Sequence, residues 1–184
     1  MASAPSSSSP MSAVERQHTN LDKKYAFNFN FQVPQKPSRY LLSFLAFIKA
    51  MERWRRDEAM ALFDDALVHR ILPESLQRPV LTKTGYGNYL TGVMPFFGPK
   101  FRVTVHEVVE AGHKMAVHCR SQGKTGTGKT YENEYCFFIH FVPLDYAVDP
   151  YSPLAPGEEL PKIELMKEFV DSTATRGLFA NQAT

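Results

Sequence analysis

A glycine-rich octapeptide, Gly123–Thr130, fits the G-x-x-x-x-G-K-[ST] pattern of phosphate-binding loops at every position. In nucleotide hydrolases this loop joins a buried strand to the N-terminus of a helix, whose amides and dipole bind phosphate oxygens. Here Met115–Arg120 reads as a strand, but Tyr131–Val142 is rich in aromatic residues, lacks a helix cap and ends at Pro143. Only 54 residues follow Thr130, too few for the rest of a parallel nucleotide-binding sheet. We therefore predict an antiparallel hairpin, with the glycines at its turn, and keep a P-loop nucleotide hydrolase as a remote alternative.

The length of this turn decides where the two cysteines lie. A two-residue turn at Thr127-Gly128 places Cys119 directly opposite Cys136, whereas a three-residue loop pairs Cys119 with Tyr135. The sequence leaves both registers open. Two cysteines in a chain of this size do not form a disulfide framework.

Composition narrows the class of protein. With 184 residues and 43% hydrophobic content, the chain can bury one sizeable core, which favours a single domain. Lys and Arg total 21 against 19 Asp and Glu, a balance that predicts neither a nucleic-acid nor a membrane partner. We find no apolar run of membrane-spanning length and no secretory signal layout, so the expected compartment is the cytoplasm.

The chain divides into three parts by composition. Residues 1–24 include a serine-rich stretch and are predicted to be a disordered tail. Residues 25–37 alternate apolar with mostly polar side chains and end in two prolines, which indicates an arm laid against the domain. Residues 38–180 form the domain, interrupted by a proline-rich insert at 143–161 that we expect to be an ordered loop or lid.

Hydrophobic periodicity predicts helices first and strands afterwards. The expected helices are a long one capped by Ser38 and running through Arg55, a short one at 58–64 and a third at about 84–96. The expected strands are 67–72, 101–109, 115–120, 131–142 and 162–170, and Asp171-Ser172 can cap a short C-terminal helix. This order predicts an α+β fold with helices packed on one face of a sheet.

Several short motifs make this pattern resemble the SnoaL-like polyketide cyclases of the nuclear-transport-factor-2-like superfamily. The resemblance rests on Leu62–Val68, on Tyr131-x-Asn133-Glu134-Tyr135, and on Lys162-Ile163 with Glu168–Ser172, and it spans about residues 38–172. It implies a cone-like curved antiparallel sheet with N-terminal helices on its concave face, a pocket inside and commonly a homodimer through the sheet. It also implies cofactor-free acid–base chemistry on a small hydrophobic substrate such as a polyketide or terpenoid intermediate of secondary metabolism. The insert at 143–161 departs from the family, which usually has a tight turn there.

Glu168 is the first candidate catalytic residue. On the last strand Glu164, Met166, Glu168 and Val170 share one face, and because Lys167 belongs in solvent, Glu168 turns inward. Desolvation in an apolar pocket raises the pKa of a carboxyl group, which suits it to move protons near neutral pH. Alternatively, Glu168 is a buried structural residue, or its side chain faces away from the pocket.

The neighbouring strand supplies candidate substrate-binding residues. Asn133, Tyr135 and Phe137 share its inward face and His140 faces outward. The Asn133 and Tyr135 side chains could donate hydrogen bonds to a developing enolate oxygen. Such residues are more often core polar groups satisfied by their neighbours.

His69 and Asp65 are further catalytic candidates, since related enzymes place acid–base residues in this region. Only one of His69 and Arg70 can face inward, and Asp65 is more often a capping or turn residue than a base. We expect the helical side of the cavity to be lined by Trp54, Tyr86, Tyr89, Phe96 and Phe97.

Metal and cofactor sites are not predicted. His106, His113 and His118 lack metal-ligand spacing with carboxylates or cysteines. Two hypotheses remain: a cofactor-independent cyclase, isomerase or dehydratase, and a non-catalytic ligand-binding or dimerisation module of the same fold. The sequence does not name the substrate.

Overall fold

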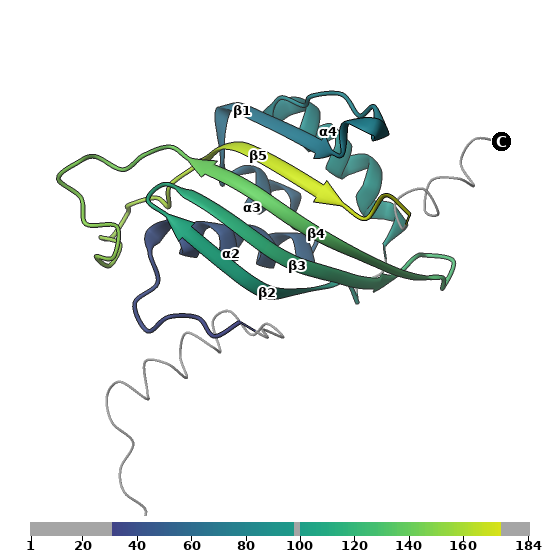
Figure 1. The fold of residues 1–184 in the computed structure, drawn as a ribbon, viewed down its shortest axis with the longest axis horizontal. Helices are drawn as coiled ribbons and strands as arrows, with labels where there is room; N and C mark the ends of the chain where they lie inside the picture. Colours follow the sequence, from purple (N-terminus) through teal and green to yellow (C-terminus); the bar gives the residue numbers. More distant parts are fainter. Residues whose placement is uncertain (1–30, 98–99, 174–184) are drawn as a thin grey trace, which may run out of the picture.

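A computed structural model describes residues 31–97 and 100–173, which form a curved, open five-stranded sheet with helices on its concave face (Figure 1). The strands are β1 (Phe63–Leu72), β2 (Arg102–Ala111), β3 (Lys114–Lys124), β4 (Thr130–Phe141) and β5 (Ile163–Val170), in the spatial order β1-β5-β4-β3-β2. The predicted α+β class, curved sheet and N-terminal helices are confirmed. The predicted tail at 1–24, residues 25–30 of the arm and the predicted C-terminal helix beyond residue 173 lie outside the described residues.

The glycine-rich motif is a hairpin turn, as predicted. β3 and β4 pair antiparallel from Lys114 opposite His140 to Lys124 opposite Thr130, so Gly123 and Lys124 belong to a strand. The Thr125 amide donates to the Lys129 carbonyl at 2.8 Å and leaves a three-residue loop, in which Gly128 has φ of 82°. Because the loop has three residues, Cys119 lies opposite Tyr135 rather than Cys136. Thr130 is the first residue of strand β4 (Thr130–Phe141), so a strand stands where a phosphate-binding loop needs a helix.

The core lies between helix α2 (Arg39–Glu52) and the concave face of the sheet. Ser38 caps this helix as predicted, because its Oγ accepts a hydrogen bond from the Leu41 amide at 2.9 Å. Phe44 is fully buried and its ring lies 6.4 Å from that of Phe137 on β4. The inward residues of β4 alternate as predicted, which places Asn133 and Phe137 on the side of the helices.

The predicted boundary between the second helix and the first strand is wrong. Helix α3 (Arg56–Met60) is shorter than expected, and β1 begins at Phe63 instead of Leu67. β1 pairs with β5, with Phe63 opposite Ile163, so tertiary pairing overrides the local helical pattern. This pair is parallel, whereas all the other strand pairs are antiparallel as predicted.

Helix α4 (Lys83–Val93) covers β1 and continues into a 3₁₀ turn at Met94–Phe96, close to the predicted 84–96. Gly87 lies where α3 and α4 approach closely: a Cβ there would come within 2.7 Å of the Arg56 guanidinium, which donates to the Gly87 carbonyl at 3.1 Å. The contact explains a glycine inside a helix despite its conformational cost.

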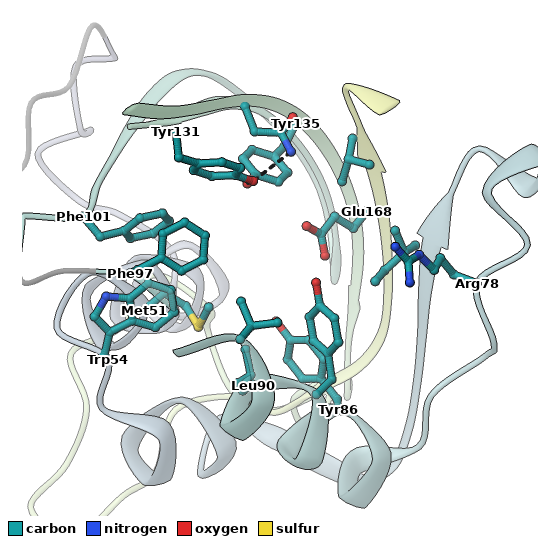
Figure 2. Close-up of a pocket in the computed structure, with 15 residues that line it drawn as sticks. Met51, Trp54, Arg78, Tyr86, Leu90, Phe97, Phe101, Tyr131, Tyr135 and Glu168 are labelled. Atoms are coloured by element: carbon teal, nitrogen blue, oxygen red, sulfur yellow. Dashed lines mark hydrogen bonds between the residues drawn. The ribbon is translucent and has the colours of Figure 1, made fainter. Parts of the chain in front are cut away.

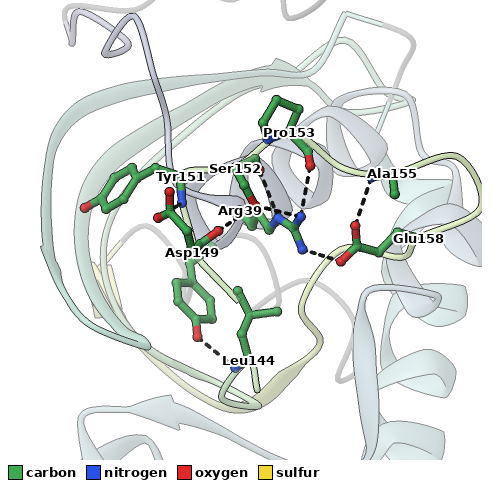
Figure 3. A network of polar contacts seen from close by, with 9 residues as sticks. Arg39, Leu144, Asp149, Tyr151, Ser152, Pro153, Ala155 and Glu158 are labelled. Atoms are coloured by element: carbon green, nitrogen blue, oxygen red, sulfur yellow. Dashed lines mark hydrogen bonds and ion pairs between the residues drawn. The ribbon is translucent and has the colours of Figure 1, made fainter. Parts of the chain in front are cut away.

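The insert at 143–161 is ordered and is fixed to the first turn of α2 (Figure 3). The buried Arg39 guanidinium donates to the carbonyls of Ser152 and Pro153 at 3.0 and 2.9 Å and forms an ion pair with Glu158. The insert follows the end of β4 that is remote from the hairpin turn. Among the described residues, no helix is long and apolar enough to cross a membrane.

Candidate functional site

A pocket opens between helix α4, the end of α2 and the concave face of β4 and β5 (Figure 2). It encloses about 670 Å³, including its open mouth. Its walls are mostly aromatic and aliphatic, and its lining residues are Met51, Trp54, Ile71, Arg78, Tyr86, Tyr89, Leu90, Val93, Phe97, Phe101, Tyr131, Asn133, Tyr135, Glu168 and Val170. No residue of the 143–161 insert lines this pocket, so the insert is not its lid.

A second, smaller lobe of about 400 Å³ adjoins the pocket and extends between α2 and the sheet. The two lobes share Met51, Tyr86, Phe101, Tyr135 and Glu168. Phe137, predicted as a substrate-binding residue, lines this second lobe together with other apolar side chains. Glu168 therefore lies where the two lobes meet.

Glu168 and His69 form a pair at this junction. Glu168 faces inward, as the alternation of β5 predicts, and its Oε2 lies 3.1 Å from His69 Nε2. The His69 side chain is fully buried, whereas 15% of the Glu168 side chain is exposed to the cavity. Of His69 and Arg70, the structure turns His69 inward and leaves Arg70 exposed. The adjacent strands β1 and β5 position the pair, because His69 is registered with Met166.

Geometry indicates which nitrogen of His69 carries the proton. The carboxylate of Glu168 is an acceptor, so Nε2–H is the donor. His69 Nδ1 is buried and has no hydrogen-bond partner within residues 31–97 and 100–173. A proton on Nδ1 would be an unpaired buried donor, at a cost of about 1–3 kcal/mol. A single proton on Nε2, directed at Glu168, therefore fits the site best.

The His69 ring is held in place by its surroundings. It stacks on Tyr86 with ring centroids 4.2 Å apart, and its backbone exchanges two hydrogen bonds of 2.9 Å with Leu81. The imidazole therefore has little freedom to leave Glu168.

Four tyrosines surround the carboxylate. Burial raises the pKa of Tyr86, Tyr89, Tyr131 and Tyr135, and the negative charge of Glu168 raises each of them further. These phenols therefore keep their protons at neutral pH and act as neutral hydrogen-bonding groups.

Asn133 and Tyr135, the predicted oxygen ligands, belong to a hydrogen-bonded chain on this wall. Asn133 Nδ2 donates to the Tyr131 hydroxyl at 3.0 Å, and the Tyr131 and Tyr135 hydroxyls lie 3.0 Å apart. The Tyr135 hydroxyl lies a further 3.0 Å from Ser121 Oγ. Both predicted residues line the pocket, but Asn133 is 4% exposed and is engaged by Tyr131.

Comparison with known proteins agrees with this architecture. Residues 44–143, more than half of the chain, match the SnoaL-like domain family. The chain belongs to this family. A search of the curated proteins by sequence found no match.

Solved structures with the same fold include enzymes of small-molecule chemistry. BvnE pinacolase from Penicillium brevicompactum is 19% identical and superposes with a TM-score of 0.63 over 79% of this chain and 94% of its own. AusH from Aspergillus nidulans is 22% identical, with a TM-score of 0.57 over 73% and 84%. An epoxide hydrolase of the LEH-like type from M. tuberculosis is 14% identical, with a TM-score of 0.54 over 78% and 90%. At such identities the likeness shows the fold alone.

The aromatic wall of this SnoaL-like domain differs in one residue from the expected set. Trp54 stacks on Phe97 with ring centroids 5.1 Å apart, and Trp54, Tyr86, Tyr89 and Phe97 all line the pocket. Phe96 does not line it, and 39% of this residue is exposed. It lies in the 3₁₀ turn after α4, where the change of helical period turns its side chain outward.

Asp65 does not belong to the pocket. Strict alternation would place it on the same face as Phe63 and Leu67, but β1 is irregular between Phe63 and Val68. The Ala66 amide donates to Asp64 Oδ1 at 2.8 Å in this irregular segment. The Asp65 carboxylate is 97% exposed and binds Lys83 at 2.8 Å, which lowers the pKa of Asp65. The structure therefore does not bring Asp65 to the pocket in which its catalytic role was predicted.

Sequence reasoning missed several of the lining residues, among them Arg78, Phe101 and Tyr131. Tyr131 could have been found, because it continues the inward alternation of Asn133 and Tyr135. Arg78 follows the short 3₁₀ helix Glu74–Leu76 and reaches the pocket only through the path of its loop. Within the described residues, no three His, Cys, Asp or Glu side chains gather as a metal-binding cluster.

Proposed function

We propose that this SnoaL-like protein is a cofactor-independent acid–base enzyme that cyclises, isomerises or dehydrates a hydrophobic polyketide- or terpenoid-type intermediate of secondary metabolism. The observation that carries the proposal is a carboxylate held by a buried histidine at the junction of two mostly apolar lobes. Pockets that combine apolar walls with a few convergent polar groups are typical of small-molecule sites. Two proteins of the same fold are a pinacolase and an epoxide hydrolase by name. They support the proposal that this protein is an enzyme acting on a small molecule.

In this proposal Glu168 touches the substrate and moves a proton, and His69 is a positioning residue that acts through Glu168. The Nε2–H of His69 fixes one carboxylate oxygen, so the other can accept a proton from the substrate and return it. Tyr89, Trp54 and the apolar lobe hold the substrate and exclude water.

The role of His69 can be separated from simple packing. We expect His69→Leu to lower kcat about tenfold to a hundredfold, because a hydrogen bond to a charged group is lost. His69→Gln keeps an N–H at a similar position and should restore most of this loss. If both variants remain folded by thermal melting and are equally impaired, the positioning role is contradicted.

The function is tested by genetics combined with chemistry. Deletion of the gene in its host should make one hydrophobic intermediate accumulate, detected by liquid chromatography with mass spectrometry. Reintroduced wild-type protein should consume it, and Glu168→Gln should not. If Glu168→Gln restores normal metabolite levels, the protein is the non-catalytic ligand-binding or dimerisation module instead.

We also propose that a second copy of the chain covers the outer face of the sheet, and that the protein acts in the cytoplasm. Phe138 on β4 and Phe169 on β5 are 43% and 41% exposed on that face, with their rings 5.9 Å apart. Val68 and Val109 are exposed large hydrophobic residues of the same sheet. Exposed apolar surface of this kind supports a homodimer through the sheet.

A further inference from the structure

The described residues that line the two lobes of the pocket include one charge of each sign. These charges belong to Arg78 and Glu168, and the other lining side chains are apolar, or polar without a charge. The Glu168 side chain is 15% exposed at the junction of the lobes, whereas Arg78 is an exposed residue at the rim. Figure 2 shows both on one side of the pocket, opposite the aromatic wall of Trp54, Phe97 and Phe101. The pocket is therefore polarised, with an aromatic side and a charged side.

The loop that carries Arg78 joins β1 to α4 and is fixed at both ends. Near its start, the Gln77 amide donates to the Glu74 carbonyl at 2.8 Å. At its end, the backbone of Leu81 exchanges two hydrogen bonds of 2.9 Å with that of His69. Arg78 therefore reaches the pocket from a backbone of defined path.

The residue directly before Arg78 has an uncommon backbone conformation. Gln77 is left-handed, with φ of 50°, a region that residues with a Cβ rarely adopt. The other non-glycine residue with a positive φ in the described part of the chain is Trp54, at 52°, which lines the same pocket. Backbone strain of this kind gathers at ligand sites, where it places a functional side chain. Both conformations therefore point to this pocket as the place where a ligand is bound.

The charge of Arg78 acts on a second lining group, the hydroxyl of Tyr89. Burial raises the pKa of Tyr89 and the charge of Glu168 raises it further, whereas Arg78 lowers it. A cation lowers the pKa of a neighbouring phenol because it stabilises a negative charge there. The rim beside Arg78 therefore favours an anion, and the junction beside Glu168 does not.

The chemistry of this cation favours a carboxylate over other anions. A guanidinium group presents two parallel N–H donors that match the two oxygens of a carboxylate. A phosphate monoester carries a charge of about −1.5 to −2 at neutral pH, which one guanidinium group does not balance. The nearby charge of Glu168 would repel the excess. A carboxylate carries one charge, which Arg78 balances.

We infer that Arg78 is the anion-binding residue of the site and that the substrate is a hydrophobic carboxylic acid, whose carboxylate binds Arg78 while its apolar body lies against the aromatic wall. This inference rests on the proposed function and deepens it by naming the substrate class. The carboxylate is an anchor and is not changed in the reaction. Because Glu168 repels it, the acid group stays at the rim and a carbon of the apolar body is presented to Glu168.

Equilibrium binding of 4-phenylbutanoate and of 4-phenylbutanamide, its neutral counterpart, to the full chain tests the inference without turnover. Trp54 is the single tryptophan of the chain and lines the pocket, so its fluorescence reports binding at this site. The wild-type protein should bind the acid more tightly than the amide. Arg78→Met should weaken binding of the acid about tenfold, the effect of hydrogen bonds to a charged group at a partly exposed site. Binding of the amide should change by less than about twofold, because methionine keeps an apolar stem of similar length.

Arg70→Met is the matched control, because it removes the same charge from an exposed residue of β1 that lines neither lobe. At physiological ionic strength it should leave binding of the acid within about twofold of the wild type. Arg78→Lys keeps the charge but not the paired donors, and should weaken binding of the acid about threefold. Equal losses in Arg70→Met and Arg78→Met would overturn the inference. So would equal losses of acid and amide binding in Arg78→Met, or no measurable binding of the acid by the wild-type protein.

The natural substrate gives a second test. The intermediate that accumulates after deletion of the gene should be a carboxylic acid, which mass spectrometry identifies by its exact mass before and after methyl esterification. Arg78→Met should act mainly on the KM for this acid, raising it about tenfold. A neutral intermediate would overturn the inference and leave the proposed function standing, whereas turnover by Glu168→Gln would overturn the proposed function.

Discussion

Glu168→Gln is expected to lower kcat on the accumulated intermediate about a thousandfold, within the range that a positioned acid–base group contributes. Glutamine keeps the shape of the side chain and can still accept from His69 Nε2, but it cannot take up a proton. Binding of the intermediate should change little, because the walls of the pocket are untouched. Steady-state kinetics, together with titration of the intermediate at equilibrium, measure the two effects separately.

Glu164→Gln is the matched control for this prediction. Glu164 lies on β5 four residues earlier and does not line either lobe. The same substitution there should leave kcat within about twofold, as expected for a site that touches nothing in the pocket. If kcat falls equally in the two variants, then the total charge of the strand matters, and the position of Glu168 does not.

Arg39→Ala is expected to destabilise the protein by about 3 kcal/mol, because several hydrogen bonds of a buried charged group are lost at once. Arg39 is 4% exposed, and its guanidinium also donates to Ser152 Oγ at 3.0 Å. Its removal leaves the carbonyls of Ser152 and Pro153 without their donor and releases the insert from α2 (Figure 3). For a chain of this size, the melting temperature should fall by about 6–12 °C.

Arg55→Ala provides the comparison, since Arg55 is exposed and follows the same helix. Its melting temperature should lie within about 2 °C of the wild type, as for most surface substitutions. If the Arg39→Ala protein has the same melting temperature as the Arg55→Ala protein, the insert is not held by Arg39. The pKa of Glu158 is lowered by the Ala155 amide and by Arg39, so Glu158 remains a charged partner at neutral pH.

The parts of the site that local patterns control were predictable. Alternation along β5 and β4 placed Glu168, Asn133 and Tyr135 on the inward face, because a strand turns successive side chains to opposite sides wherever its pairing is regular. The glycines of the hairpin turn and the Ser38 cap are likewise set by neighbours in sequence.

Parts that depend on distant contacts were not predictable. The start of β1 and the outward turn of Asp65 come from parallel pairing with β5 and an irregularity of β1, to which the sequence around residue 65 gives no clue. The choice of His69 over Arg70 was settled by its contacts with Glu168 and Tyr86, 99 and 17 residues away in the chain. The position of Arg78 in the pocket and the anchoring of the insert by Arg39 also depend on contacts that are distant in the sequence.

Conversion of the accumulated intermediate by the purified protein in D₂O, followed by mass spectrometry, tests the central claim that Glu168 transfers a proton. Wild-type protein and Glu164→Gln should form product that carries deuterium on carbon wherever the Glu168 carboxyl exchanges its proton with D₂O before returning it, and Glu168→Gln should form about a thousandth as much product. Deuterated product formed by Glu168→Gln at the wild-type rate would contradict the account.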